Sequence, residues 1–383
     1  MQESEFEEIR PYNDNEIAEK IGLVLQDPVF DKVLNYLFRK PETVAKKRRE
    51  LEKARTIEQL QTTFVRNLVE TVIHTTTKGL SFSGLEYLDK SKSYLFISNH
   101  RDIILDSAFL NYLILLNGMN TTQIAIGDNL LIYNWITHAV KLNRAFVVKR
   151  NIASRELLES SRKLSQYMRK SIVADNTSVW IAQREGRTKD GHDQTQVALL
   201  KMLNFSNEKS LAEGFGELTI VPISISYEIE PCGICKVDEL IKRDLGSYEK
   251  TKADDLHNME EGIFKQKGRV HFAFGRPILQ SFLQETNHLP TNKFIQSLTE
   301  RIDHRIHQYY KLWPNNYVAY DQMYGTGEYM DNYTSQDIIN FRNLVEEAQA
   351  ASDQNPEEVA RRFTKMYARP VENAQIAEEV FRS

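Results

Sequence analysis

The chain has 383 residues, of which 41% are hydrophobic and 27% are charged, and its formal net charge is −4. These proportions are typical of a globular protein with a large core. No apolar run is long enough to predict a membrane-spanning helix, and the slight negative charge argues against nucleic acid as a partner. The first residues are acidic rather than basic and apolar, so we expect no secretory signal and a cytoplasmic location.

Residues 1–80 are predicted to form a helical N-terminal region. Apolar side chains between Val24 and Leu37 recur at the three-to-four spacing of a helix. The strongly charged segment 40–55 (KPETVAKKRRELEKAR) is predicted as a solvent-exposed helix. Its alternative interpretation is a basic helix that contacts anionic lipid headgroups.

Residues 81–290 are predicted to form an α/β domain with a mixed, mostly parallel sheet flanked by helices. Short β-branched and aromatic runs alternate there with longer helical patterns. The nearly continuous apolar content of 218–226 indicates a strand that is covered on both faces. Strands are expected at 94–98, 123–126, 145–149, 178–182, 218–226 and 269–274, with helices at 102–118, 129–142, 152–175 and 195–204.

The remaining residues, 291–383, are predicted to form a helical C-terminal extension. The helical pattern continues to about residue 311, and a stretch rich in Tyr, Asn and Gly follows from 314 to 333. Further helices are expected at 335–349, 356–367 and 373–382.

The two cysteines, Cys232 and Cys235, form a Cys-x-x-Cys pair. A zinc site of this type needs a second pair of ligands with suitable spacing, and the sequence has no other cysteine. We therefore expect reduced thiols in a loop and no metal site.

His100 follows a predicted strand directly and is the candidate general base. Asp102 and Asp106 lie two and six positions later, at the start of a predicted helix. A histidine in such a turn can take a proton from an alcohol if its other ring nitrogen donates to a carboxylate. Asp106, about one helical turn on, is the expected partner, and Asp102 is the reserve.

Cationic side chains follow two other predicted strands. Lys149 and Arg150 end one strand, and Glu185-Gly186-Arg187 follows the next. Cations at the ends of neighbouring strands can converge on one phosphate, which the planar guanidinium of arginine binds through two donors. The sequence thus predicts an anionic substrate beside a base.

Two hydrolytic alternatives lack their motifs. The sequence contains no His-Glu-x-x-His run for a metallohydrolase, and its other histidines lack ligand spacing. It also contains no Gly-x-Ser-x-Gly elbow for a serine hydrolase.

Four ordered blocks and a closing strand resemble the glycerol-3-phosphate and lysophosphatidate acyltransferase superfamily, and most closely its bacterial glycerol-3-phosphate acyltransferase branch. The resemblance covers roughly residues 85–280. Two departures stand out. Five residues rather than four separate His100 from Asp106, and the third block lacks the residue that the family has between its Gly and Arg. The blocks are His100-Arg101 with its downstream Asp, Arg144-Ala145-Phe146 leading to Lys149-Arg150, Gly186-Arg187-Thr188-Lys189, Val221-Pro222 with Tyr227-Glu228, and the closing strand from Gly268 to Ile278.

The resemblance implies acyl transfer without a bound cofactor. His100, oriented by Asp106, would deprotonate an acceptor hydroxyl, which attacks the thioester of acyl-CoA or of acyl carrier protein. Glycerol 3-phosphate and lysophospholipids are the expected acceptors, at a peripheral site on the inner face of the membrane. The alternatives are a lyso aminolipid acceptor and a non-catalytic, lipid-binding or scaffold homologue of this fold. The implied phosphate ligands are Arg150 and Arg187, assisted by Lys149 and Arg101, with Glu185 and Gly186 beside them.

Overall fold

A single mixed sheet organises the chain in the structure, a computed structural model that describes residues 3–38, 40–150, 152–246 and 248–382. The strand order is β1-β7-β6-β2-β5-β3-β4. The β6–β7 pair is antiparallel, and every other neighbouring pair is parallel. This confirms the predicted mixed, mostly parallel α/β fold. The strands are β1 Gly79–Ser83, β2 Leu95–Ser98, β3 Gln123–Gly127, β4 Ala145–Val148, β5 Val179–Ala182, β6 Ile220–Tyr227 and β7 Arg269–Phe274.

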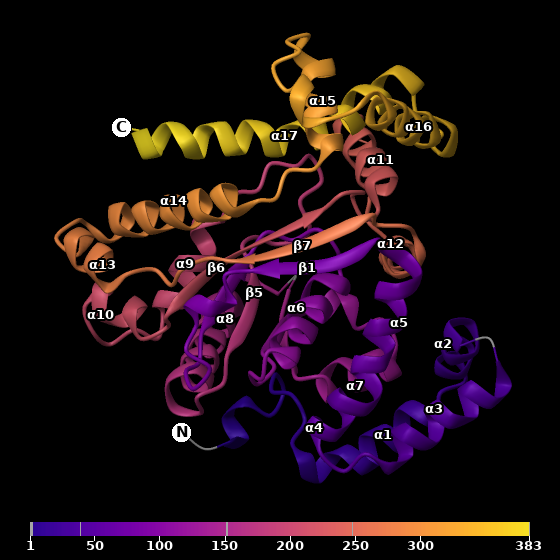
Figure 1. The fold of residues 1–383 in the computed structure, drawn as a ribbon. Helices are drawn as coiled ribbons and strands as arrows, with labels where there is room; N and C mark the ends of the chain where they lie inside the picture. The colour runs from indigo at the N-terminus through magenta and orange to yellow at the C-terminus, as the bar shows by residue number, and fades with distance from the viewer. Residues whose placement is uncertain (1–2, 39, 151, 247, 383) are drawn as a thin grey trace.

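Helices cover both faces of the sheet (Figure 1). Because successive side chains of a strand point to opposite faces, Leu95 and Ile97 of β2 join one core cluster while Phe96 joins the other. All eight residues of β6 are buried, as its continuous apolar content predicts. The first face is covered by α8 Ser154–Arg169, α9 Val197–Asn204, α10 Leu211–Gly216, α13 Gln280–Thr286 and α14 Thr291–Tyr309, and the second by α5 Arg66–Thr76 and α6 Leu105–Leu116.

The N-terminal helices have a separate core cluster, which also includes Leu142. The charged segment 40–55 contains a helix that buries Val44 and Leu51 and leaves most of its other side chains at least partly exposed. This agrees with the solvated helix that its charge predicts. The elements of this region are α1 Ile17–Gln26, α2 Pro28–Phe38, α3 Pro41–Lys53, α4 Ile57–Gln59 and a π-helical segment Leu60–Val65, packed near α7 Asn134–Leu142.

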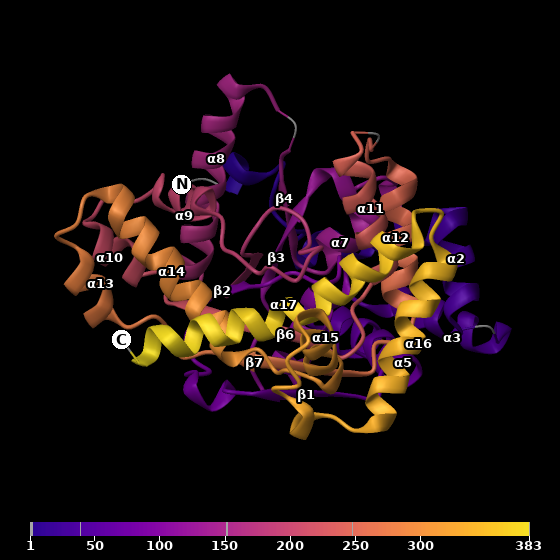
Figure 2. The ribbon, with the colours of Figure 1, turned by 90° about the horizontal axis from the view of Figure 1, so that it is seen from above.

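Three helices of the C-terminal extension pack against α11 Gly233–Asp244: α15 Pro314–Tyr324, α16 Ser335–Ala351 and α17 Pro356–Arg382. Helix α17 is continuous, although separate helices are expected at 356–367 and 373–382. It continues through Pro370, and Ala368 and Val371 on either side are buried. Packing therefore outweighs the helix-breaking tendency of proline here. Figures 1 and 2 show α17 alongside α14.

Several elements of the structure have no strong signal in the sequence and were not predicted. Strand β1 is short, contains Gly and Ser, and is largely exposed at the edge of the sheet, so it lacks a strong hydrophobic pattern. Helices α11 and α12 (Lys252–Phe264) were also not predicted. The expected loop position of the cysteines is wrong for Cys235, which lies within α11, while Cys232 immediately precedes that helix; both thiols are free.

Within the described ranges, no helix combines the length and the apolar character needed to cross a bilayer.

The imidazole of His271 in β7 joins the edge strand β1 through two side-chain hydrogen bonds. Its ring nitrogens lie 2.9 Å from Ser81 Oγ and 3.1 Å from Ser83 Oγ. Burial lowers the pKa of His271 from 6.5 to about 4, and Lys311 adds to this effect. Between these pH values the unfolded chain therefore binds a proton that the folded chain does not.

We expect the free energy of unfolding to decrease as the pH falls from about 6.5 towards 4. His271→Gln should reduce this loss by about 1–2 kcal/mol, after allowance for partial solvent exposure. Urea unfolding of both proteins at several pH values measures the difference. His288→Gln, at an exposed position, is the matched control and should keep the wild-type profile. Equal pH dependence in the His271 variant and the wild type would contradict this account.

Candidate active site

His100 and Asp106 form a hydrogen-bonded pair at the carboxyl end of β2. His100 Nδ1 lies 2.8 Å from Asp106 Oδ2. Residues 101–104 form an irregular turn, and α6 begins only at Leu105. The turn accommodates the additional residue between the histidine and the aspartate, so Asp106 remains within hydrogen-bond reach.

The carboxylate of Asp106 is completely buried and accepts three further hydrogen bonds. Its Oδ2 accepts from the backbone N–H of Arg101 at 2.6 Å and of Asp102 at 3.0 Å. Its Oδ1 accepts from the hydroxyl of Tyr227 at 2.9 Å. Burial, together with the charge of Asp106, raises the pKa of Tyr227, which therefore remains a hydroxyl donor. Because an ionised carboxylate only accepts, Nδ1 of His100 donates to it, and Nε2 is left with a lone pair that can accept a proton.

Asp102, the reserve partner, has a different role in the structure. Its Oδ1 accepts from the backbone N–H of Ile104 at 2.8 Å and of Leu105 at 2.7 Å, so it satisfies the N–H of the first residue of α6. Burial raises the pKa of the Asp102 carboxyl, and the nearby Asp106 charge adds to the effect. Asp106, and not Asp102, contacts the imidazole.

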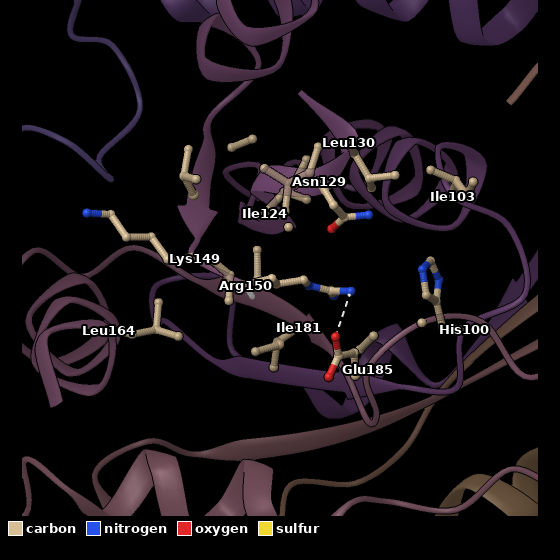
Figure 3. Close-up of a pocket in the computed structure, with 18 of the residues that line it drawn as sticks. His100, Ile103, Ile124, Asn129, Leu130, Lys149, Arg150, Leu164, Ile181 and Glu185 are labelled. Carbon is tan, nitrogen blue, oxygen red and sulfur yellow. Dashed lines mark ion pairs between the residues drawn. The ribbon is translucent and has the colours of Figure 1, made fainter. Parts of the chain in front are cut away.

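His100 lines a cavity of about 860 Å³ that has a polar part and an apolar part. Figure 3 shows Arg150 and Glu185 beside His100, with Leu164 on the opposite side of the pocket. The cavity lies at the edge where the parallel strands β2, β3, β4 and β5 end, because the loops that follow them supply its polar groups. Its apolar lining includes Ile124, Ile126, Leu130, Ile136, Val140, Val147, Leu164, Ile181, Leu199 and Met202.

Lys149 and Arg150 both line the cavity, and each is paired with a carboxylate. Lys149 Nζ lies 2.7 Å from Glu8 Oε2, and Arg150 Nη1 lies 3.2 Å from Glu185 Oε1. The guanidinium of Arg150 also packs on the backbone of Gly127, where an added Cβ would lie 2.5 Å from Arg150 Nε. A side chain at position 127 would occupy the space of the Arg150 guanidinium, so glycine at this position allows Arg150 to adopt its present conformation.

Arg187 is the most deeply buried of the predicted phosphate ligands that line the cavity, with 6% of its surface exposed. It lines the cavity, and its Nη1 is buried without a hydrogen-bond partner among the described residues. Gly186 has a φ of +71°, a left-handed conformation that favours glycine, in the turn that places Arg187. A buried guanidinium nitrogen with unused hydrogen-bonding capacity is suited to bind an anion.

The polar side chains at the cavity that were not predicted as ligands include Asn129, Arg184 and Lys189. Lys189 pairs with Glu239, and burial lowers the pKa of Lys189 to about 8. These three residues lie next to predicted site motifs in the sequence, and this proximity is the feature that could have identified them. Within the described part of the chain, no group of three or more His, Cys, Asp or Glu residues is arranged to hold a metal ion.

Arg101 does not line the cavity, so the structure does not place it among the phosphate ligands as expected. It is 1% exposed, and its guanidinium turns towards two buried carboxylates. Nη2 lies 2.5 Å from Asp193 Oδ2, and Nη1 lies 3.4 Å from Glu230 Oε2. Both partners lie far along the chain, and no sequence motif indicates them.

No curated protein sequence matches the chain. Among solved structures, the 1-acyl-sn-glycerophosphate (LPA) acyltransferase PlsC from Thermotoga maritima is 11% identical with a TM-score of 0.36, over 74% of this chain and 92% of that chain. The signal recognition particle 54 kDa protein from Aeropyrum pernix K1, in complex with GDP, is 10% identical with a TM-score of 0.21, over 91% and 87%.

The family model described as Acyltransferase matches residues 79–226. This range includes His100, Asp106, Lys149, Arg150 and Arg187. The match supports the acyltransferase superfamily for the part of the chain that carries the candidate site.

Proposed function

We propose that this protein transfers a fatty acyl group from acyl-CoA or acyl carrier protein to the hydroxyl of a glycerol-3-phosphate-type or lysophospholipid acceptor. The observation that carries the proposal is the His100–Asp106 pair in the wall of a cavity with a cationic part and an apolar part. Acyl transfer to such an acceptor needs these three features together: a base, a phosphate site and space for an alkyl chain.

In the proposed reaction, His100 Nε2 takes the proton of the acceptor hydroxyl. The oxygen attacks the thioester carbonyl, a C–O bond forms, and the C–S bond breaks. The imidazolium then returns the proton to the departing thiolate, so the histidine is regenerated. Asp106 stabilises the transient positive charge and fixes the ring, because Nδ1 donates to its buried carboxylate.

The acceptor phosphate is proposed to bind Arg187 and Arg150. Arg187 has a buried donor without a partner among the described residues, and Arg150 faces the same cavity as His100 (Figure 3). Fixing the phosphate would hold the acceptor hydroxyl near the base and lower the entropic part of the barrier. Glu185 pairs with Arg150 and would orient its guanidinium, and Lys149 would add positive charge.

The acyl chain is proposed to occupy the apolar part of the cavity, where Leu164, Leu199 and Met202 contribute to the wall. Burial of each methylene contributes about 0.8 kcal/mol, so this lining can bind a long chain firmly. Since a lysophospholipid acceptor or a lipid product exchanges with a bilayer, we also propose peripheral attachment at the inner face of the membrane.

His100→Ala should lower kcat by about 10²–10⁴-fold, because the general base is lost. Asp106→Asn should also lower kcat, since the amide cannot accept all the hydrogen bonds that orient the ring. The measurement is transfer from labelled acyl-CoA and acyl carrier protein to glycerol 3-phosphate, lysophosphatidate, dihydroxyacetone phosphate and a lyso aminolipid. His138→Gln, at a histidine outside the cavity lining, is the control. A rate unchanged by His100→Ala would refute the mechanism.

Arg187→Gln should raise the KM for a phosphorylated acceptor by about 10–100-fold, the loss expected for a charge-assisted contact. Arg150→Gln should act in the same direction. Both effects should be much smaller with an acceptor analogue that lacks the phosphate. Arg155→Gln, at an exposed arginine outside the cavity lining, should leave KM unchanged. Equal KM values for the wild type and the Arg187 variant would reject the phosphate assignment.

A further inference from the structure

A buried cluster of four charges lies beside residues 100–102, which are called the base turn below. The cluster consists of Arg101, Asp193, Glu230 and Lys236 and is referred to as the Arg101 cluster. We propose that Arg101 is a positioning residue, and that this cluster holds the turn at residues 100–102 in the conformation in which Asp106 orients His100. Through the same contacts, α14 and α17 become part of the framework of the site. The effect on catalysis rests on the proposed function, whereas the effect on the turn does not.

Asp193 connects the base turn to the loop that carries Arg187. Its Oδ2 accepts from Arg101 Nη2 at 2.5 Å and from Asn99 Nδ2 at 3.1 Å. Its Oδ1 accepts from the hydroxyl of Thr188 at 2.7 Å. The backbone of Thr188 also donates to His100 O at 2.9 Å. Two sites that the reaction needs close together, the base and a phosphate ligand, are therefore fixed to one buried carboxylate.

Lys236 contacts both the backbone of the turn and the carboxylate of Glu230. Its ammonium donates to the carbonyl oxygen of Arg101 at 2.7 Å and to Glu230 Oε1 at 2.6 Å. Glu230 in turn lies 3.4 Å from Arg101 Nη1. Arg101 is thus held at both its side chain and its carbonyl, while its N–H donates to Asp106. Moving the Arg101 peptide would disturb the orientation of that N–H.

The C-terminal helices complete the surroundings of the cluster. The hydroxyl of Tyr367 in α17 accepts from the backbone N–H of Glu230 at 2.8 Å. At the end of α14, His307 Nε2 lies 2.5 Å from Asp193 O. The Arg101 guanidinium lies over the ring of Tyr310, 5.4 Å from its centroid. Segments far apart in the sequence therefore meet at the residue next to the base.

The energetics favour one arrangement of this cluster. Two cations and two carboxylates balance in charge, and all four side chains are buried. Removing one partner from a buried ion pair leaves an uncompensated charge, which is strongly unfavourable. The turn cannot move without separating these pairs, and a displacement of about 1 Å near reacting groups can lower a rate by about 100-fold. The cluster is therefore suited to hold the base in place without contacting substrate.

The test replaces Arg101 with lysine, which keeps the charge and loses the planar fork. We expect kcat to fall by roughly 10–100-fold while the KM for the phosphorylated acceptor stays within about twofold. Hydrogen exchange followed by mass spectrometry should show faster exchange in residues 98–106, where the N–H groups of Arg101 and Asp102 are otherwise held by Asp106. Exchange in β4 should not change.

Arg169→Lys is the matched control, because Arg169 forms an ion pair with Glu217 at 3.0 Å and does not contact the base turn. It should leave kcat and exchange in 98–106 as in the wild type. Tyr367→Phe keeps all four charges and should speed exchange in 98–106 to a smaller extent, which tests the link to α17 if Arg101→Lys does not fold.

A raised acceptor KM with unchanged kcat and unchanged exchange in Arg101→Lys would overturn the proposal and return Arg101 to the phosphate ligands. Unchanged exchange in both the Arg101 and Tyr367 variants would also overturn it. If the wild-type protein transfers no acyl group to any acceptor, the proposed function fails. The exchange measurement would then still decide whether the cluster holds the turn.

Discussion

The carboxylate of Asp106 accepts four hydrogen bonds in a fully buried position, and the geometry of the site depends on this group. A buried carboxylate is costly unless its oxygens are satisfied. Here the donors come from the imidazole of His100, two successive backbone N–H groups and Tyr227. Because β6 supplies Tyr227 and the turn after β2 supplies the others, one anion connects two neighbouring strands to the start of α6. The imidazole has little freedom to rotate away from it.

The cavity combines two environments that are usually separate. The polar groups near His100 come from loops at the carboxyl ends of parallel strands, whereas strand and helix side chains supply most of the apolar wall. In such a low-dielectric surrounding, the attraction between a cation and an anionic ligand is stronger than in water. Lys149 and Arg150 already have carboxylate partners, while Arg187 retains a buried donor without one among the described residues. The three cations are therefore not equivalent.

The sequence predicted much of the fold because six of the strands have strong apolar patterns, and their positions agree with the expected ranges to within about two residues. It also indicated which side chains meet, since parallel strands end at one edge of the sheet. Asp106 reaches His100 despite the additional residue between them because the turn ahead of α6 is irregular. No sequence motif indicates this turn. Strand β1 has no core-facing pattern to reveal it.

The position of Arg101 could not be predicted for a different reason. It follows the candidate base directly in the sequence, so a role in substrate binding was the natural expectation. Its actual partners, Asp193 and Glu230, are brought to it by packing of distant segments. The same limit applies to α17, where Pro370 suggests an end to the helix but buried neighbours extend it. Contacts between residues far apart in the sequence determine both the position of Arg101 and the continuity of α17.

Helix α12 lies against the base turn at Gly262, where an added Cβ would lie 2.3 Å from Asp102 Oδ2. The same helix contributes Asp255 and Met259 to the cavity wall. The absence of one side chain therefore sets how closely this wall approaches the base. A larger residue at Gly262 would require either the Asp102 side chain or α12 to move. Gly262 therefore affects the position of the cavity wall although it does not line the cavity.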